Sequence, residues 1–170
     1  MPPPGHRLER LVERHRLDTF TCGHVALDEW RRRHALTADR KGTARSYVWA
    51  GRADGVAAYF SLAPHLVVRE EVPDKVGRGS PRQIPAVLLA RLALSERLHG
   101  QGYGAMLLVE ALGVAVNAIR RSGGRLIVVD AIDTRAAGSY ERHGFVRMAV
   151  PGRLVMKASD AAASLSLLWP

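Results

Sequence analysis

Cysteine is almost absent from this chain of 170 residues, since Cys22 is the only one. One cysteine excludes an intramolecular disulfide and a cysteine-rich zinc site, and it is typical of a reducing compartment. Long apolar runs are lacking too, because no stretch approaches the roughly 20 residues that a membrane helix needs. The opening residues, 1–6, have no apolar segment like that of a signal peptide. We therefore expect a cytoplasmic protein that binds no metal and no membrane.

Lysine is also scarce, because 22 of the 25 basic side chains are arginine, and the formal net charge is +9. The planar guanidinium group suits phosphate, so this composition favours nucleic acid or another polyanion as a partner. The alternative is a genome-wide bias toward arginine and alanine codons, which would carry no functional meaning. The charge alone therefore does not identify a partner.

The length and the apolar fraction of 47% are those of one globular domain with a sizeable core. We expect a flexible tail over 1–6, a single domain over 7–158 and a C-terminal tail over 159–170. Apolar periodicity and turn residues predict a mixed α+β domain with one central sheet. The predicted strands cover 8–12, 46–50, 56–66, 87–94, 126–129 and 154–158, and the predicted helices cover 27–41, 103–119 and 134–143.

Several of these elements carry more detailed predictions. In the first helix Leu27, Trp30, His34 and Ala38 follow helical spacing, so this face is expected to point inward. The helix from residue 103 is apolar on almost every side and is expected to be buried in the middle of the domain. The turn over 52–55 contains Asp54-Gly55, a strong hairpin signal, and 70–85 is expected to be a loop. Asp133 is the expected N-cap of the last helix, and Gly144 followed by Phe145 is expected to close it.

Three glycines alternate between a strand-like segment and a helix, in His99-Gly100-Gln101-Gly102-Tyr103-Gly104. Glycine allows a backbone to approach an anion closely, and a helix N-terminus adds unpaired N–H donors and the positive end of the helix dipole. The segment therefore predicts a site for a phosphorylated cofactor. A Rossmann dinucleotide site is the competing interpretation, but the glycine spacing does not match it and the acid expected about 20 residues later is missing.

The stretch from Leu88 to Phe145 resembles the GCN5-related N-acetyltransferases. In that family a Gln/Arg-x-x-Gly-x-Gly/Ala loop holds the pyrophosphate of acetyl-CoA at a helix N-terminus. The pattern falls here on His99, Gly102 and Gly104, with histidine in place of glutamine or arginine at the first position. The resemblance implies a mixed, mostly antiparallel sheet flanked by helices, acetyl-CoA as the donor and no metal. The cofactor-binding residues that it implies are Leu92, Ala93, Leu94, His99, Gly100, Gln101, Gly102, Tyr103 and Gly104.

A second resemblance covers nearly the whole chain. The segment Phe20-x-Cys22-Gly23-x-x-x-Leu27-Asp28-x-Trp30 looks like the start of acetyltransferase toxins from type II toxin–antitoxin modules. Their later motifs follow in order, as Tyr59-Phe60-Ser61-Leu62, Leu89-Ala90-Arg91-Leu92-Ala93, Ala131-Ile132-Asp133 and Tyr140-Glu141-Arg142-x-Gly144-Phe145. This resemblance implies an N-acetyltransferase that acetylates the amino group of aminoacyl-tRNA and blocks translation. It also implies a ribbon-helix-helix antitoxin as a partner and a homodimer.

Tyr140 is the predicted catalytic residue, because it resembles the tyrosine that the family places near the CoA sulfur. A phenol with a pKa of about 10 is protonated at neutral pH and can protonate a departing thiolate. The alternative is a tyrosine that only packs on an amphipathic helix. The resemblance also implies an oxyanion donor among the backbone amides of Leu92 to Leu94. The candidate bases are His99, Glu96 and His143, although water can serve as well.

Four arginines are candidate contacts for the tRNA: Arg31, Arg32, Arg33 and Arg91. The first three could equally form an ordinary solvated helix face. Arg91 lies in a strand expected to be buried, where an arginine is normally paired. Two other functions stay open at this point: an acetyltransferase of the same fold that acts on a small-molecule or protein amine, and a binding module without catalysis. Cys22 is expected to be a small buried apolar residue.

Overall fold

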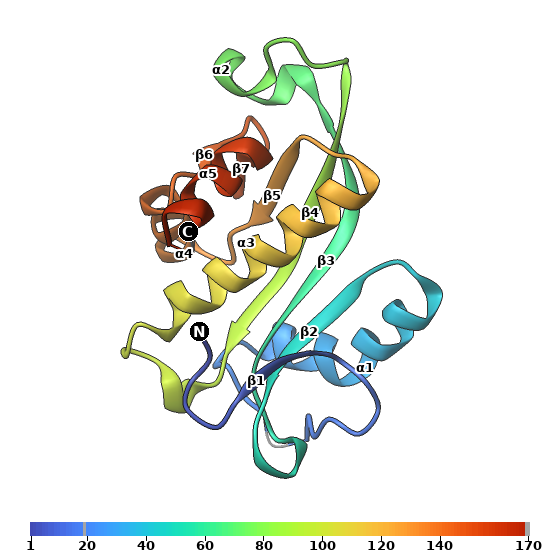
Figure 1. The fold of residues 1–170 in the computed structure, drawn as a ribbon, viewed down its shortest axis with the longest axis vertical. Coiled ribbons are helices and arrows are strands. Elements are labelled where there is room, and N and C mark those ends of the chain that lie inside the picture. Colours follow the sequence, from blue (N-terminus) through green and yellow to red (C-terminus); the bar gives the residue numbers. More distant parts are fainter. Residues whose placement is uncertain (19, 169–170) are drawn as a thin grey trace. The chain divides into compact units, whose positions relative to one another are not determined.

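The computed structural model describes residues 1–18 and 20–168, and for residues 31, 32, 167 and 168 it describes the backbone only. Seven strands form one mixed sheet (Figure 1), with β4 and β5 parallel and the pairs β1–β2, β2–β3, β5–β7 and β6–β7 antiparallel. Their order in the sheet is β1-β2-β3-β4-β5-β7-β6. The strands are β1 (Arg7–Arg10), β2 (Arg45–Ala50), β3 (Val56–Val68), β4 (Gln83–Leu94), β5 (Leu126–Asp130), β6 (Val146–Arg147) and β7 (Arg153–Lys157).

Five α-helices and three short 3-10 turns connect these strands in the part of the chain that the structure describes. The helices are α1 (Val25–Lys41), α2 (Asp74–Gly77), α3 (Tyr103–Ser122), α4 (Thr134–Arg142) and α5 (Ala158–Leu168), and the turns are η1 (Arg52–Asp54), η2 (Arg69–Glu71) and η3 (Glu96–Leu98). The predicted α+β class with one sheet is confirmed. The sequence did not predict α2, β6 or α5, and β4 begins four residues earlier than expected.

The chain forms two compact units, which are described in turn. The first unit comprises Met1–Ala63 and Ala90–Ala111, and the second comprises Pro64–Leu89 and Leu112–Pro170. Because the division falls within β3, β4 and α3, each of these elements contributes one part to each unit. The glycine loop therefore belongs to the first unit, and Tyr140 belongs to the second.

In the first unit, α1 packs against β2 over a core that includes Phe20, Cys22 and Tyr59. The predicted inward face of α1 is only partly right, because Leu27 and Trp30 pack on this core but His34 is exposed. Among the described side chains of the helix, the buried ones are those of Asp28 and Ala35. Periodicity of apolar residues could not find Asp28, since its burial depends on hydrogen bonds rather than on hydrophobicity.

The turn between β2 and β3 differs from the predicted hairpin in its backbone. The two strands pair antiparallel as expected, with Trp49 opposite Ala58. However, the left-handed conformation is adopted by Ala53 (φ 51°) and Asp54 (φ 58°), whereas Gly55 has φ −65°. The left-handed pair of this turn is therefore Ala53-Asp54, one residue earlier than the Asp54-Gly55 dipeptide that predicted the hairpin.

The prediction that helix α3 is buried in the middle of the domain is wrong on one side of the helix. Met106 is 42% exposed, although Leu107 and Leu108 beside it are buried. The single acidic side chain of the helix has a clear role, because Glu110 accepts a 2.6 Å hydrogen bond from the indole of the fully buried Trp49. Among the described residues, α3 is also the one helix long and apolar enough to cross a membrane by length and composition, so the expectation that no stretch comes near this length is wrong. Core helices of soluble proteins pass the same test.

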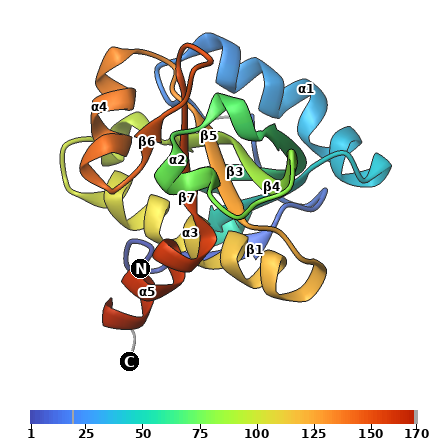
Figure 2. The same cartoon turned by 90° about the horizontal axis from the view of Figure 1, so that it is seen from above.

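In the second unit, β5 is buried from Leu126 to Val129 and pairs with β7 from Leu126–Lys157 to Asp130–Arg153. Helix α4 packs against β6 and β7, as the view in Figure 2 also shows. Its predicted ends are confirmed: the Asp133 carboxylate accepts a 2.8 Å hydrogen bond from the amide of Ala136, and Gly144 has φ 95°. The ring of Phe145 then contacts that of Tyr140 edge-on, at 5.6 Å between centroids.

Candidate active site

The glycine loop of the first unit leads from η3 into the first turn of α3. Gly100 (φ 75°) and Gly102 (φ 82°) adopt the left-handed conformation that glycine tolerates best. A Cβ atom added at either position, or at Gly104, would meet no atom within 4 Å. The loop backbone therefore borders open space where the first N–H groups of α3 lack partners within the helix. This geometry suits a phosphate group, as the sequence predicted.

The histidine that departs from the family pattern supports the loop from within. His99 Nε2 lies 2.9 Å from the carbonyl oxygen of Leu94, the last residue of β4, so this nitrogen carries the proton and donates. The amide of Gln101 likewise donates to the carbonyl of Arg97, at 3.0 Å. Both side chains fold back on the segment that precedes the loop. They fix its shape, and neither side chain extends from the loop.

Leu92, Ala93 and Leu94 form the end of β4 that runs into this loop. Ala93 is buried, and the next amide, that of Ser95, donates to the carbonyl of Ala57 at 2.8 Å. The amide of Glu96 donates to the carbonyl of Thr21 at 3.0 Å. The strand end is thus anchored on both sides, although the assignment of an oxyanion donor to residues 92–94 stays a prediction.

The segment Phe20 to Trp30, which carries the second resemblance, is built around a buried carboxylate. Asp28 is 6% exposed and accepts hydrogen bonds from the amide of Cys22 (3.1 Å) and from the hydroxyl of Thr21 (3.1 Å). Its own amide donates to the carbonyl of His24, which begins the helix. Cys22 is buried as expected, and burial raises the pKa of its thiol to about 11. The acidic residue of this motif therefore has a structural role in holding the turn before α1.

Gly23 joins this turn to the approach of the glycine loop. Its φ is 87°, and a Cβ atom there would lie 2.8 Å from Oε1 of Glu96. The carboxylate of Glu96 thus packs over a position where only glycine is accommodated without adjustment. The first motif of the chain and the segment before the glycine loop therefore form one local structure.

Arg91 contacts the last residue of the same motif. Its guanidinium lies 4.9 Å from the ring centroid of Trp30, in a cation–π contact. Nε of Arg91 is buried, and it has no hydrogen-bond partner among the described residues. Arg33 is exposed, whereas the side chains of Arg31 and Arg32 lie outside the described part. Of the two predicted tRNA contacts whose side chains the structure describes, Arg91 packs against an aromatic ring and Arg33 is exposed.

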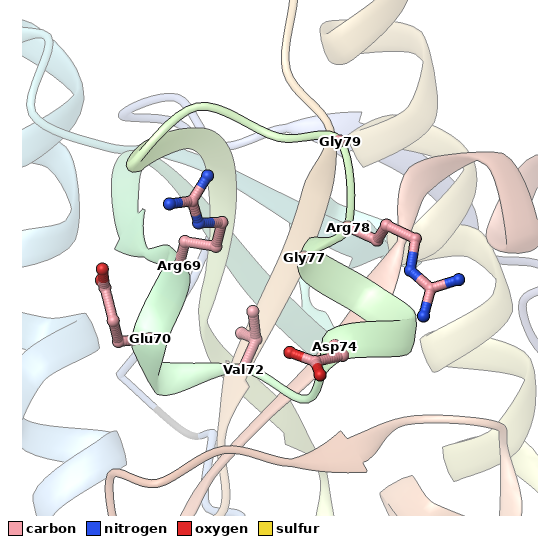
Figure 3. A pocket seen from close by; sticks show the side chains of 7 residues that line it. All are labelled: Arg69, Glu70, Val72, Asp74, Gly77, Arg78 and Gly79. Atoms are coloured by element: carbon pink, nitrogen blue, oxygen red, sulfur yellow. The ribbon is translucent and has the colours of Figure 1, made fainter.

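Each unit contains one cavity worth noting. The first unit has a cavity of about 720 Å³ whose lining includes Thr21, Ser95, Glu96 and Arg97, on the segments that precede α1 and the glycine loop. The second unit has a cavity of about 510 Å³ at the β3–β4 connection (Figure 3), where the guanidinium of Arg78 points away from Arg69. None of the site residues predicted from the sequence lines this second cavity. Its residues are Arg69, Glu70, Val72, Asp74, Gly77, Arg78 and Gly79.

Tyr140 lies on α4 in the second unit. Its hydroxyl has no hydrogen-bond partner within residues 1–18 and 20–168. Burial, with a smaller contribution from the negative charge of Asp130, raises the pKa of Tyr140 to about 12. Tyr140 is only partly buried, and its hydroxyl is not one of the buried side-chain atoms that lack a partner, so solvent can satisfy it. The role of Tyr140 as the acid stays a prediction, with a packing tyrosine as the alternative.

Two of the candidate bases have structural partners. Nε2 of His99 is engaged by Leu94, and Nδ1 of His143 lies 2.8 Å from the carbonyl of Ser139 at the end of α4, as expected for a histidine at a helix C-terminus. The structure also reveals a polar group that the sequence did not single out, formed by His65, Asp130 and Arg153 in the second unit. These residues are far apart in the chain, and no motif connects them.

The chain is an α+β domain in which a strand of a mixed sheet leads through a glycine loop into a helix. This arrangement is that of the GCN5-related acetyltransferase fold. No protein-family model matches the chain. It is 31% identical over 155 residues to a tRNA-acetylating toxin of Mycobacterium tuberculosis, an alignment that covers 91% of this chain and 93% of the relative. The chain therefore belongs to the family of tRNA-acetylating toxins, which confirms the acetyltransferase class predicted from its motifs.

Solved structures of related toxins agree with this assignment. The structure of AtaT complexed with acetyl-methionyl-tRNAfMet superimposes with a TM-score of 0.85 at 26% identity, and covers 97% of this chain and 99% of that one. A tyrosine-to-phenylalanine mutant of KacT superimposes with a TM-score of 0.87 at 21% identity over 94% of this chain and 99% of that one, a likeness of fold alone. The predicted fold class is thereby confirmed.

Proposed function

We propose that this protein transfers the acetyl group of acetyl-CoA to the free amino group of an aminoacyl-tRNA and thereby stops translation. Family membership supports the reaction, and the open glycine loop of the first unit supports the donor. The single observation that supports Tyr140 as the acid is its environment on α4, in which burial raises the pKa of the phenol to about 12 and keeps it protonated.

The reaction balances without a metal or a redox partner. The neutral amine attacks the thioester carbonyl, the C–S bond breaks, and the electron pair leaves on sulfur. Tyr140 gives its proton to the departing thiolate, and the proton released by the amine restores the phenol through water. The products are an N-acetyl-aminoacyl-tRNA and free CoA. Backbone amides in the 92–94 segment are the proposed donors to the oxyanion, and the 99–104 loop is the proposed cradle for the pyrophosphate.

The acceptor is a polyanion, so the arginines without acidic partners are the ones available to contact it. Many arginines of the first unit are already neutralised, since Arg7, Arg10, Arg14, Arg40 and Arg45 all pair with carboxylates. Several exposed cations of the second unit form no ion pair within the described part of the chain, among them Lys75, Arg78, Arg82, Arg120 and Arg121. We propose that some of them contact phosphate, as we also propose for Arg91 of the first unit.

The expected partners follow from the family. AtaT has been solved with the C-terminus of the antitoxin AtaR, and KacTA with DNA. We propose that this chain likewise has an antitoxin of the ribbon-helix-helix type and works in the cytoplasm, where charged tRNA is found. A homodimer is proposed on the same basis.

Transfer of radiolabelled acetyl groups to bulk charged tRNA tests this function, with deacylated tRNA as the control. We expect label on the charged tRNA alone. Tyr140→Phe should bind acetyl-CoA but lose most turnover. Tyr47→Phe is the control, because Tyr47 lies in β2 and stacks on Phe60 of β3, and this variant should keep its turnover. Label on both tRNA samples would indicate acetylation of the nucleic acid itself, and label only on small amines or proteins would refute the proposed acceptor.

A further inference from the structure

Among the described residues, Arg91 is the one cation with a buried side-chain nitrogen that lacks a hydrogen-bond partner. It forms no ion pair in that part of the chain either, whereas Arg7, Arg10 and Arg14 of the same unit are each bound to a carboxylate. A charged group that is partly removed from water is costly unless an acceptor compensates it, so buried polar atoms are normally paired. Arg91 is therefore a candidate site for an anion from outside the chain.

The surroundings of Arg91 leave one side of its guanidinium open. The group lies over Trp30 of α1, with its central carbon 4.9 Å from the ring centroid, and Nε has no contact with solvent. Nη1 and Nη2 are not among the buried atoms that lack a partner, and no described residue binds them. The two terminal nitrogens therefore face solvent, while the indole holds the group in place. This arrangement suits a two-point contact with an oxyanion such as phosphate.

Arg91 also directly precedes the proposed oxyanion segment, residues 92–94. Side chains alternate along a strand, so Arg91 lies on the same face of β4 as Ala93. Ala93 is buried in the core against which Trp30 of α1 packs. Residues 91 and 93 are roughly 7 Å apart along the strand. An anion bound by Arg91 is thus held on the α1 side of the segment at which the acetyl carbonyl is proposed to react.

The chemistry of the acceptor decides which anion fits this place. In an aminoacyl-tRNA the carboxyl group of the amino acid is esterified to the terminal ribose, so it carries no charge. The anion nearest to the reacting amine is then the phosphate on the 5′ side of the terminal nucleotide. We propose that Arg91, held by Trp30, binds this phosphate and thereby places the terminal nucleotide with its amine beside residues 92–94. The inference rests on the proposed acetylation of aminoacyl-tRNA, and it assigns Arg91 to one particular phosphate of that substrate.

Two small acceptors that differ by one phosphate test the inference. One is an aminoacyl ester of adenosine, and the other is the same ester of adenosine 5′-monophosphate, which reproduces the end of a charged tRNA. For the wild type we expect kcat/KM to be about tenfold to a hundredfold higher with the phosphorylated acceptor, the range given by a hydrogen bond to a charged group. Arg91→Gln should abolish this preference, and Arg91→Lys should retain part of it, because lysine keeps the charge but not the planar fork.

The matched control is Arg7→Gln. Arg7 is an exposed arginine of the same unit, paired with Glu9 at 3.1 Å, and this variant should keep the wild-type preference for the phosphorylated acceptor.

A binding measurement tests the site without the chemical step. The Nε–H resonance of Arg91, identified by its absence in Arg91→Lys, should shift on titration with adenosine 5′-monophosphate and stay unchanged with adenosine. CoA is present in both titrations to occupy the donor site. Trp30→Leu removes the ring under the guanidinium and should weaken this binding several-fold.

Equal kcat/KM values for the two acceptors in the wild type would overturn the inference, as would a phosphate preference that survives in Arg91→Gln. Acetylation of free amino acids that depends on Arg91 would also contradict it, because a carboxylate would then be the ligand. A weaker affinity of Arg91→Gln for an antitoxin, with an unchanged phosphate preference, would assign the site to a protein partner instead. If Arg91→Gln does not fold, the wild-type comparison and Arg91→Lys still decide. If no acceptor is acetylated but the Nε–H resonance shifts, the proposed function fails and the phosphate site stands.

Discussion

Asp28 offers a direct test of whether the motif that begins the chain is structural or contacts substrate. Asp28→Ala removes a carboxylate that accepts from the hydroxyl of Thr21 and the buried amide of Cys22. Hydrogen bonds to a charged acceptor contribute about 1.5–3 kcal/mol each, and a buried amide left without a partner costs about 1–3 kcal/mol. We expect a loss of roughly 3 kcal/mol of unfolding free energy, close to 10 °C in Tm for a chain of this size.

Urea denaturation measures this loss, and acetyl transfer assayed well below the transition shows whether the folded fraction retains its turnover. Glu29→Ala is the matched control, because Glu29 is the next residue of the same helix turn and is exposed. It should cost less than about 0.5 kcal/mol. A variant Asp28→Ala as stable as wild type but inactive would refute the structural role and place Asp28 at the substrate.

Four further predictions concern the same units. Gly23→Ala should lower the free energy of unfolding by about 1–2 kcal/mol, because the backbone of Gly23 is left-handed. The loss should be the same in a Glu96→Ala background, since the Glu96 carboxylate that packs over Gly23 can move away. Urea denaturation of the wild type, the two single variants and the double variant tests this. His99→Ala should raise the KM for acetyl-CoA several-fold with little change in kcat, as measured by initial rates, because it loosens the loop without touching the acid. Glu110→Leu should cost about 1–3 kcal/mol in the same denaturation assay, because it leaves a buried indole N–H unpaired. The folded state raises the pKa of the Cys22 thiol to about 11, so the thiol binds its proton more tightly than in the unfolded chain. The resulting stabilisation is present below pH 9 and is lost as the pH rises toward 11. Between roughly pH 8 and pH 10.5, the urea midpoint of Cys22→Ala should therefore fall less than that of the wild type.

Predictions from local chemistry are confirmed at the two ends of α4 and at the glycine loop, although not at the Asp54-Gly55 turn. Asp133 caps α4 and Gly144 ends it, since each acts within one turn of its own position. The glycine loop follows the same logic, because Gly100 and Gly102 take conformations that other residues rarely adopt. The identity of a capping or left-handed residue constrains the backbone beside it and needs no knowledge of the rest of the fold.

Predictions failed where a side chain is stabilised by a distant partner. Apolar spacing placed His34 on the inner face of α1, whereas the buried polar residue is Asp28, held by groups six and seven positions earlier. In the sequence Glu110 is an isolated charge in an apolar helix, whereas in the structure it accepts a hydrogen bond from Trp49, which is 61 residues away. Hydrophobic periodicity treats every buried polar residue as an exception, so it cannot predict those that have partners.

The group of His65, Asp130 and Arg153 extends this argument to the second unit. Asp130 and Arg153 become neighbours only through the β5–β7 register, in which a shift of one residue would turn one of them to the opposite face of the sheet. His65 joins them from a third strand, 88 positions from Arg153. A sequence can therefore identify Tyr140 by its motif, whereas the Asp130–Arg153 ion pair is fixed by pairing between strands. Substitutions that shift this pairing, such as those in the short turn after β6, should break the ion pair without altering any residue of the recognised motifs.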